Sequence, residues 1–112
     1  MPNVTVAIST YNRAHLVLAA LESVFAQTYT DYDVVVVDNG SSDGTRDLLR
    51  QFGDRIRYAY QDNTGRAGGR NRAIELAAGR FVAFLDSDDL WLPDKLERQM
   101  PVLEANPAVG LV

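Results

Sequence analysis

The amino-acid sequence predicts an α/β fold, a mostly parallel sheet flanked by helices, on three observations. Short apolar runs rich in β-branched residues alternate with segments of helical periodicity along the 112 residues. Val34 to Val37 are four consecutive valines, a pattern typical of a parallel strand that is buried on both faces. Three strongly polar loops each follow an apolar run, as expected where a ligand binds beyond the carboxyl ends of parallel strands.

The first strand is expected at Val4–Ser9, an apolar run that ends in a polar loop. Asn12 in that loop is suited to cap the following helix, because its side chain can accept a hydrogen bond from a free backbone amide. The helix is indicated by an apolar face at Val17, Leu21, Val24 and Phe25.

A short second helix is expected after the valine strand. Ser42 or Asp43 can cap it, and Gly53 is expected to end it. Its apolar positions are Leu48, Leu49 and Phe52. Arg55–Tyr60 then predicts a third strand.

The last part of the chain predicts another helix, a strand and a final helix. Gly65 to Arg72 opens the third helix, and Gly79 is expected to close it in the left-handed conformation. Phe81–Leu85 is the fourth strand. Pro93 suits the first turn of a fourth helix, whereas Pro101 lacks an amide hydrogen and predicts a kink or an early end there.

The polar loops follow strands one, two and four and are Ser9–Arg13, Asp38–Gly44 and Asp86–Asp89. The carboxyl ends of parallel strands lie at one edge of a sheet, so we expect the three loops to meet there. This edge is the predicted site.

The strongest chemical signal is the acidic segment Asp86-Ser87-Asp88-Asp89, with three carboxylates in four residues. Like charges this close repel one another, and a divalent cation would relieve the repulsion. Oxygen ligands of this kind suit Mg²⁺ or Mn²⁺. On spacing alone, a solvated loop or a cap for the next helix is an equally good interpretation.

Three other features of the sequence are compatible with a nucleotide. Asp38 ends the valine strand, where a carboxylate can bind ribose or base, although a turn-forming bond to Ser41 or Ser42 is the more common role. Tyr11 can stack on a base or simply pack. The glycines and arginines of Gly65 to Arg72 favour phosphate at a helix N-terminus, or form a solvated basic surface.

Several other classes of protein are disfavoured. The net charge of −4 and the lack of a basic stripe argue against nucleic acid as a partner. The chain has no cysteine, which excludes disulfides and thiolate metal sites. His15 has no serine or cysteine partner motif, and no Walker-type phosphate loop is present. The N-terminus lacks a signal-peptide pattern, and no apolar run is long enough to cross a bilayer.

Taken together, these segments resemble family-2 glycosyltransferases of the GT-A fold, which is a Rossmann-like α/β fold. The resemblance covers nearly the whole chain in order. Its motifs are VAISTYNR at 6–13, SVFAQTY at 23–29, VVDNGSSDGT at 36–45, NTG at 63–65, GRNR at 69–72 and AFLDSDDLWLPDKL at 83–96.

The resemblance implies a role for each matched site residue. The nucleotide-binding residues would be Ser9, Thr10, Tyr11, Asp38, Asn39, Arg70 and Asp86. Asp88 would be the main ligand of a divalent cation, Mn²⁺ or Mg²⁺, with Asp89 beside it. The implied reaction is an inverting transfer of a sugar from a nucleoside-diphosphate sugar to a hydroxyl of a saccharide or another acceptor.

The resemblance also bears on the extent of the domain. Residues 1–112 are expected to form one donor-binding domain, the N-terminal portion of a GT-A fold, that ends before the acceptor-binding part. The general base is expected beyond Val112, and Val109–Val112 as the start of a fifth strand. For the complete protein we expect a cytoplasmic location, peripheral to the inner face of the membrane.

Two questions stay open at this point. Many family members carry two aspartates where this chain has Asp38 and Asn39, which leaves uridine, deoxythymidine and guanosine as candidate bases. The alternatives to a transferase are a non-catalytic fragment that binds nucleotide or forms a homodimer through an open sheet edge, and a nucleotidyltransferase. A nucleotidyltransferase is expected to have a glycine-rich loop where this chain has Ser9–Arg13.

Overall fold

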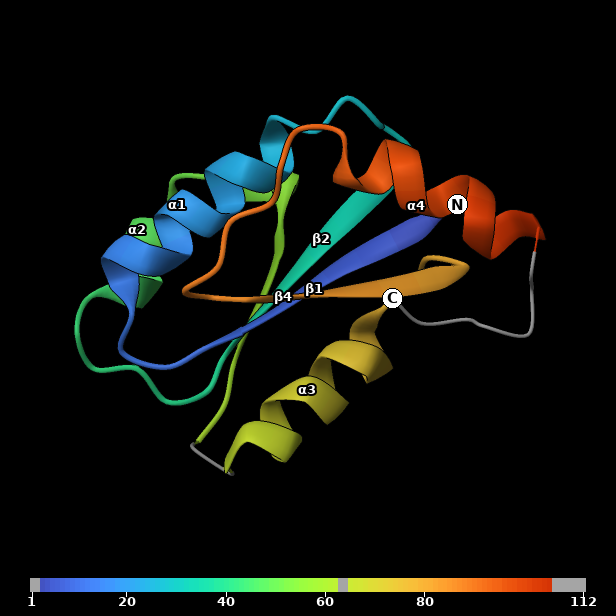
Figure 1. Ribbon diagram of the computed structural model, residues 1–112. Coiled ribbons are helices and arrows are strands. Elements are labelled where there is room, and N and C mark those ends of the chain that lie inside the picture. Colours follow the sequence, from blue (N-terminus) through green and yellow to red (C-terminus); the bar gives the residue numbers. More distant parts are fainter. Residues whose placement is uncertain (1–2, 63–64, 106–112) are drawn as a thin grey trace.

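The protein, described here from a computed structural model, is built on a parallel sheet of four strands in the order β3-β2-β1-β4. The structure describes residues 3–62 and 65–105, so the strand expected at Val109–Val112 lies outside the described residues. The strands are β1 (Val4–Thr10), β2 (Tyr32–Asp38), β3 (Arg57–Tyr60) and β4 (Phe81–Asp86). The helices are α1 (Ala14–Phe25), α2 (Thr45–Arg50), the 3₁₀ turn η1 (Gly53–Arg55), α3 (Gly65–Leu76) and α4 (Lys95–Ala105). The predicted α/β fold is confirmed (Figure 1).

Helices cover both faces of the sheet (Figure 1), and each face has its own core. The larger core, under α1, α2 and α4, contains Val4, Val6, Ile8, Val34, Val36, Leu21, Leu49, Leu96 and Met100. The smaller core, under α3, contains Ala7, Val35, Val37 and Ala73. Because side chains alternate between the faces of a strand, burial of both sets requires the continuous apolar runs seen in β1 and β2.

The start of α1 differs from the expectation. Arg13 occupies the N-cap position and makes no side-chain cap bond, while Asn12 has a positive φ of 49°. The Asn12 side chain crosses instead to the loop after β2, where its Oδ1 accepts a hydrogen bond from the Ser42 amide at 2.8 Å. The amide of Asn12 donates to Ser41 Oγ, also at 2.8 Å. The expected cap was wrong because Asn12 joins two loops.

Gly79 was also expected to act as a left-handed helix cap, and this was wrong. α3 ends at Leu76, and Gly79 is not among the positive-φ residues. A Cβ on Gly79 would lie 2.5 Å from the Thr5 amide nitrogen and 2.7 Å from the carbonyl carbon of Val4. Glycine is required here because the backbone runs directly against β1.

The last helix is longer than Pro101 suggested. α4 begins at Lys95, beyond Pro93, and runs through Pro101 to Ala105. The expected early end and the expected place of Pro93 inside the first turn were therefore wrong. Leu96 and Met100 are each only 1% exposed, and their burial against the sheet offsets the amide hydrogen that Pro101 lacks.

Candidate nucleotide and metal site

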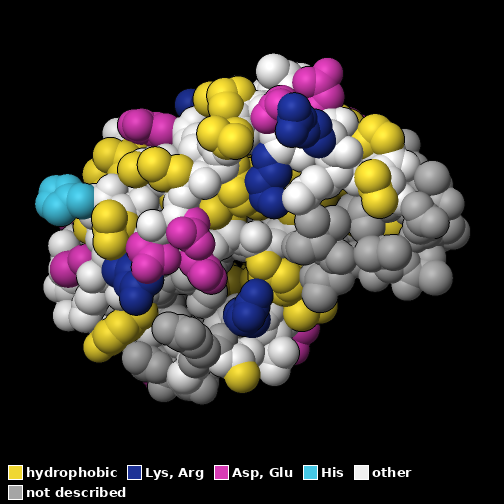
Figure 2. Space-filling model, viewed as in Figure 1, with side chains coloured by type: hydrophobic (Ala, Val, Ile, Leu, Met, Phe, Trp, Pro, Cys, Tyr) yellow, Lys and Arg dark blue, Asp and Glu magenta, His cyan; other side chains and the backbone are white. Residues whose placement is uncertain are grey.

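Two adjoining clefts lie where the strands end. The first, which we call the loop cleft, has a volume of about 450 Å³. It is lined by Ser9, Thr10, Tyr11, Arg13, Asn39, Gly65, Arg70, Asp86, Ser87 and Asp88. Residues from the carboxyl ends of β1, β2 and β4 thus meet here, as the sequence predicted. Figure 2 shows acidic and basic side chains gathered around a hollow in this face of the molecule.

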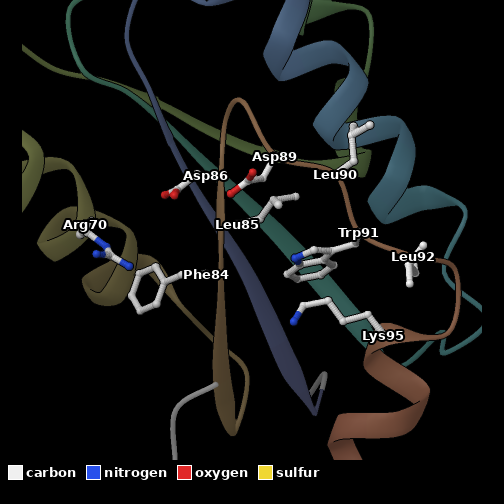
Figure 3. A pocket seen from close by; sticks show the side chains of 9 residues that line it. All are labelled: Arg70, Phe84, Leu85, Asp86, Asp89, Leu90, Trp91, Leu92 and Lys95. Carbon is white, nitrogen blue, oxygen red and sulfur yellow. The ribbon is translucent and has the colours of Figure 1, made fainter.

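The second cleft, which we call the tryptophan cleft, has a volume of about 610 Å³. It shares Arg70 and Asp86 with the loop cleft. Its other lining residues are Phe84, Leu85, Asp89, Leu90, Trp91, Leu92 and Lys95 (Figure 3). The two clefts are therefore neighbours, and Arg70 and Asp86 lie at their junction.

Each side of the tryptophan cleft carries a cation against an aromatic ring. The Arg70 guanidinium lies 4.5 Å from the centre of the Phe84 ring, and Lys95 Nζ lies 5.2 Å from the Trp91 ring (Figure 3). Such contacts fix a flexible cation in one place while leaving its hydrogen-bond donors available. Arg70 is thereby held at the junction of the two clefts.

Asp38 and Asn39, which follow one another at the end of β2, are placed differently. Asp38 is 0% exposed, and its carboxylate accepts hydrogen bonds from the Ser41 amide at 2.9 Å and the Tyr58 hydroxyl at 2.6 Å. Burial, and then the hydrogen bond to Asp38, raise the pKa of the Tyr58 hydroxyl above its ordinary value. The Asp38 carboxylate is buried in this structure, and its two hydrogen bonds hold the loop after β2. Its expected contact with base or ribose stays a prediction.

Asn39 lines the loop cleft and connects three elements. Its Nδ2 donates to the carbonyl oxygen of Gly65 at 2.9 Å, and its Oδ1 accepts a hydrogen bond from Gln61 Nε2 at 3.1 Å. Its backbone amide donates to the carbonyl oxygen of Thr10 at 2.9 Å. The end of β2 is thus tied to the end of β1, to the residue that follows β3 and to the start of α3.

The other expected nucleotide-binding residues also line the loop cleft. Tyr11 is 48% exposed, whereas Thr10 is only 2% exposed. Thr10 Oγ1 has no hydrogen-bond partner among residues 3–62 and 65–105. Ser9 faces α3, because a Cβ on Gly69 would run into Ser9 Oγ. The glycine at that position lets α3 approach the end of β1.

The acidic segment forms a compact cluster at the edge of the loop cleft. One carboxylate oxygen from each of Asp86, Asp88 and Asp89 lies within 4.8 Å of the other two, and all three residues are exposed. The segment turns back on itself through a hydrogen bond from the Asp89 amide to the Asp86 carbonyl oxygen at 3.0 Å. Three converging hard oxygen donors fit a divalent cation such as Mn²⁺ or Mg²⁺.

Gln27, two residues beyond the end of α1, anchors the segment that follows the acidic cluster. Its Nε2 donates to the Leu92 carbonyl oxygen at 2.6 Å, and its Oε1 accepts a hydrogen bond from the Leu96 amide at 3.0 Å. The Trp91 amide donates to Ser23 Oγ at 3.2 Å. A residue that is only 6% exposed therefore fixes the course of the chain between Asp89 and α4.

The sequence reasoning assigned no role to several of these residues. Arg13 and Lys95 line the clefts, and Phe84 supports Arg70. For Phe84 a signal was available, because Phe81, Ala83 and Leu85 alternate with it and place it on the opposite face of β4. The anchoring by Gln27 spans 65 residues to Leu92, a separation that local patterns do not report.

Among the described residues, no helix is both long and apolar enough to span a membrane.

The comparisons with known proteins identify the family and the fold. The family model described as "Glycosyl transferase family 2" matches residues 5–112. The chain is 44% identical over 103 residues to TuaG of Bacillus subtilis, a putative teichuronic acid biosynthesis glycosyltransferase. The aligned part covers 88% of this chain and 41% of TuaG. It is 42% identical over 105 residues to the Escherichia coli glucosyltransferase WfgD, and the aligned part covers 92% of this chain and 42% of WfgD. The chain therefore spans less than half the length of these relatives.

Two solved structures are similar to this chain in fold. The mannosyltransferase PcManGT from Pyrobaculum calidifontis, in complex with GDP-Man and Mn²⁺, superposes with a TM-score of 0.85 at 32% identity over 91% of this chain and 32% of its own. TarS from S. aureus, residues 1–349 in complex with UDP, superposes with a TM-score of 0.85 at 26% identity over 94% and 33%. The fold is that of the N-terminal part of a GT-A enzyme, and the chain belongs to glycosyl transferase family 2.

Proposed function

We propose that this chain is the donor- and metal-binding part of a metal-dependent, inverting glycosyltransferase. The observation that carries the proposal is the convergence of Asp86, Asp88 and Asp89 within 4.8 Å beside the loop cleft. A nucleoside-diphosphate sugar needs a cavity for the nucleoside, positive charge for the diphosphate and a route for the sugar. The two clefts and the residues between them offer these three features.

The loop cleft is the proposed place of the nucleoside. Tyr11 would stack on the base, while Ser9, Thr10 and Asn39 would surround base and ribose. The unpartnered Thr10 Oγ1 supports this, because a buried hydroxyl gains a hydrogen bond when a polar ligand arrives. Uridine is the first candidate nucleoside, since TarS is seen with UDP and WfgD is named for UDP-Glc. Guanosine is the second, because PcManGT is seen with GDP-Man.

The junction of the clefts is the proposed place of the diphosphate and the start of the sugar. Arg70 would pair with phosphate oxygens, and Asp86 would face the ribose and the sugar. Asp88 and Asp89 would hold Mn²⁺ or Mg²⁺. Mn²⁺ is the ion named in the PcManGT complex. When bound, the cation supplies positive charge that stabilises the departing nucleoside diphosphate.

The reaction we propose is a single displacement. The acceptor hydroxyl oxygen forms a bond to the sugar C1 while the bond from C1 to the diphosphate oxygen breaks, which inverts C1, and a base takes the hydroxyl proton. We assign that base to none of the described residues and expect it beyond Val112. This chain's own contribution is to bind and orient the donor and to stabilise the leaving group.

The acceptor and the location of the complete protein are also proposals. WfgD is named for transfer to α-D-GlcNAc-diphosphoundecaprenol, an acceptor held in a membrane by its lipid. This supports a saccharide acceptor, and we propose in addition a cytoplasmic protein that works at the inner membrane face.

A non-catalytic, dimerising fragment is the second candidate. β4 is an edge strand of the described sheet, and Leu90 and Leu92 beyond it are 67% and 74% exposed. Such a face can pair two copies of the chain. Light scattering over a wide concentration range tests this, and a monomer throughout would exclude it.

A donor-turnover assay tests the transferase proposal. The chain and the complete protein that carries it would be incubated with UDP-, dTDP- and GDP-sugars, with Mn²⁺ or with a chelator, while release of the nucleoside diphosphate is followed. We expect Mn²⁺-dependent release by the complete protein and little by the chain alone. Release that is equally fast in the presence of chelator would contradict the metal-dependent proposal.

A further inference from the structure

Arg13 forms an ion pair with the carboxylate proposed above as the main metal ligand. Arg13 Nη1 lies 3.1 Å from Asp88 Oδ2, and the two side chains are 41% and 49% exposed. Both residues line the loop cleft. We propose that Arg13 is an exchanging counter-ion: it neutralises Asp88 before a cation binds, and pairs with the donor diphosphate once Asp88 holds the cation. This inference rests on the proposed function.

The backbone of Arg13 is fixed, whereas its side chain can move. The Arg13 carbonyl oxygen accepts a hydrogen bond from the Val17 amide at 2.8 Å, and the neighbouring Asn12 and Ala14 are bonded to the loop after β2. The guanidinium, by contrast, is held by an exposed ion pair, which contributes little free energy. A divalent cation can therefore displace it from Asp88 without any change in the fold.

The displaced guanidinium would lie beside a cleft that carries a second cation. Arg13, directly before α1, and Arg70, on α3, both line the loop cleft, so this cleft offers two cations to a bound anion. The amide of Ala14 at the start of α1 is already bonded to Asp43 Oδ2. That amide is occupied, whereas the Arg13 side chain can offer donors to phosphate.

Exchange of this kind makes two binding events depend on each other. While Arg13 is paired with Asp88, it competes with a cation and is not available to a phosphate. Cation binding frees the guanidinium, and phosphate binding keeps it away from Asp88. The cation and the nucleoside diphosphate should therefore each raise the affinity of the other, partly through Arg13.

Calorimetry on Arg13→Gln tests the exchange. Mn²⁺ alone is titrated first, followed by UDP, dTDP and GDP with saturating Mn²⁺, and then by the matching nucleosides. Arg50→Gln is the matched control, because it removes an equal charge from an exposed ion pair with Asp47 outside both clefts. Circular dichroism and thermal unfolding show whether each variant is folded.

The expected effects have opposite signs, which a folding defect would not produce. Arg13→Gln should bind Mn²⁺ about two- to fivefold more tightly, the range expected for loss of a weak competing ion pair. It should bind the nucleoside diphosphate roughly tenfold or more weakly, as expected for loss of a hydrogen bond to a charged group. Affinity for the nucleoside should not change, and Arg50→Gln should behave as the wild type.

Two results would overturn the inference. If the wild type binds Mn²⁺ and a nucleoside diphosphate but Arg13→Gln alters neither affinity, or weakens both, Arg13 does not exchange and the proposed function stands. If the folded wild type binds neither, the proposed donor site fails and the inference fails with it.

Discussion

The amide of Ala14, the first residue of α1, donates a hydrogen bond to Asp43 Oδ2 at 3.2 Å across 29 residues of sequence. The other oxygen of the same carboxylate accepts the Thr45 amide at 3.2 Å and the Thr45 hydroxyl at 2.5 Å. Asp43 therefore serves the N-termini of two helices and holds together the loops after β1 and β2, which line the loop cleft.

Replacing Asp43 by alanine should lower the free energy of unfolding by about 1 kcal/mol, the usual net contribution of an intramolecular hydrogen bond, since Gly44 rather than Asp43 occupies the N-cap position of α2. The measurement is urea unfolding, with Asp47→Ala as control. Asp47 lies in the first turn of α2 and makes an exposed pair with Arg50, so its loss should change little. A similar loss in both variants would show that Asp43 acts only as a surface charge.

The contribution of Asp43 should also depend on pH. The hydrogen bond from the Thr45 side chain, followed by weaker backbone bonds, lowers the pKa of Asp43 below its ordinary value of 3.8. A lowered pKa in the folded state means that the stabilisation is present above pH 3.8 and is lost as the pH falls through the lower, folded-state pKa. The difference between wild type and Asp43→Ala should therefore shrink in acid, and a difference that grows in acid would contradict this account.

The order of the strands and helices could be predicted from the sequence because each element carries its own local pattern. Burial in the sheet explains the apolar runs at Val34 to Val37 and at Phe81–Leu85, and such a run can be recognised within the segment itself. The roles of Asn12 and Gly79 depend on partners elsewhere, at Ser42 and Thr5, and were therefore mispredicted. Contacts across a sheet edge leave no periodic signal in the sequence.

Gln27→Ala should destabilise the protein by about 2 kcal/mol and weaken cation binding. The change removes the side-chain partner of the buried Leu96 amide, and an unsatisfied buried amide is costly. It also removes one of two partners of the Leu92 carbonyl oxygen, which still accepts a hydrogen bond from the Lys95 amide. It also frees the segment after Asp89, so the carboxylates are held less well. Thermal unfolding and Mn²⁺ calorimetry measure the two effects, and Gln51→Ala, at an exposed position, is the control. Unchanged Mn²⁺ affinity would separate Gln27 from the site.

The two close-approach glycines should respond differently to alanine. In Gly79→Ala the new Cβ meets backbone atoms of β1, which cannot move aside, and we expect a loss of about 3 kcal/mol. In Gly69→Ala the obstacle is the Ser9 side chain, which can rotate, and alanine favours the helix by about 1 kcal/mol. Stability should then change little while nucleotide affinity falls. Urea unfolding measures the stability of both variants, and calorimetry measures their nucleotide affinity. Equal losses of stability in Gly79→Ala and Gly69→Ala would contradict this prediction.

The candidate site was predicted in part. The loops that line it follow from strand order alone, and the acidic cluster is visible as three aspartates in four residues. At the end of β2 both Asp38 and Asn39 are buried, at 0% and 5% exposure, and of the two Asn39 lines the loop cleft. Sequence reasoning could not separate these neighbours, because their side-chain partners, Tyr58 and Gln61, belong to or follow another strand.

The central claim is that the aspartate cluster and the loop cleft form one metal-dependent nucleotide site. Its most direct test is calorimetry of UDP, dTDP and GDP, each with and without Mn²⁺, on the wild type and on Asp88→Ala. The account predicts binding that requires Mn²⁺, prefers one base and is lost in a folded Asp88→Ala. Binding that is equally tight without Mn²⁺ and in Asp88→Ala would contradict the claim.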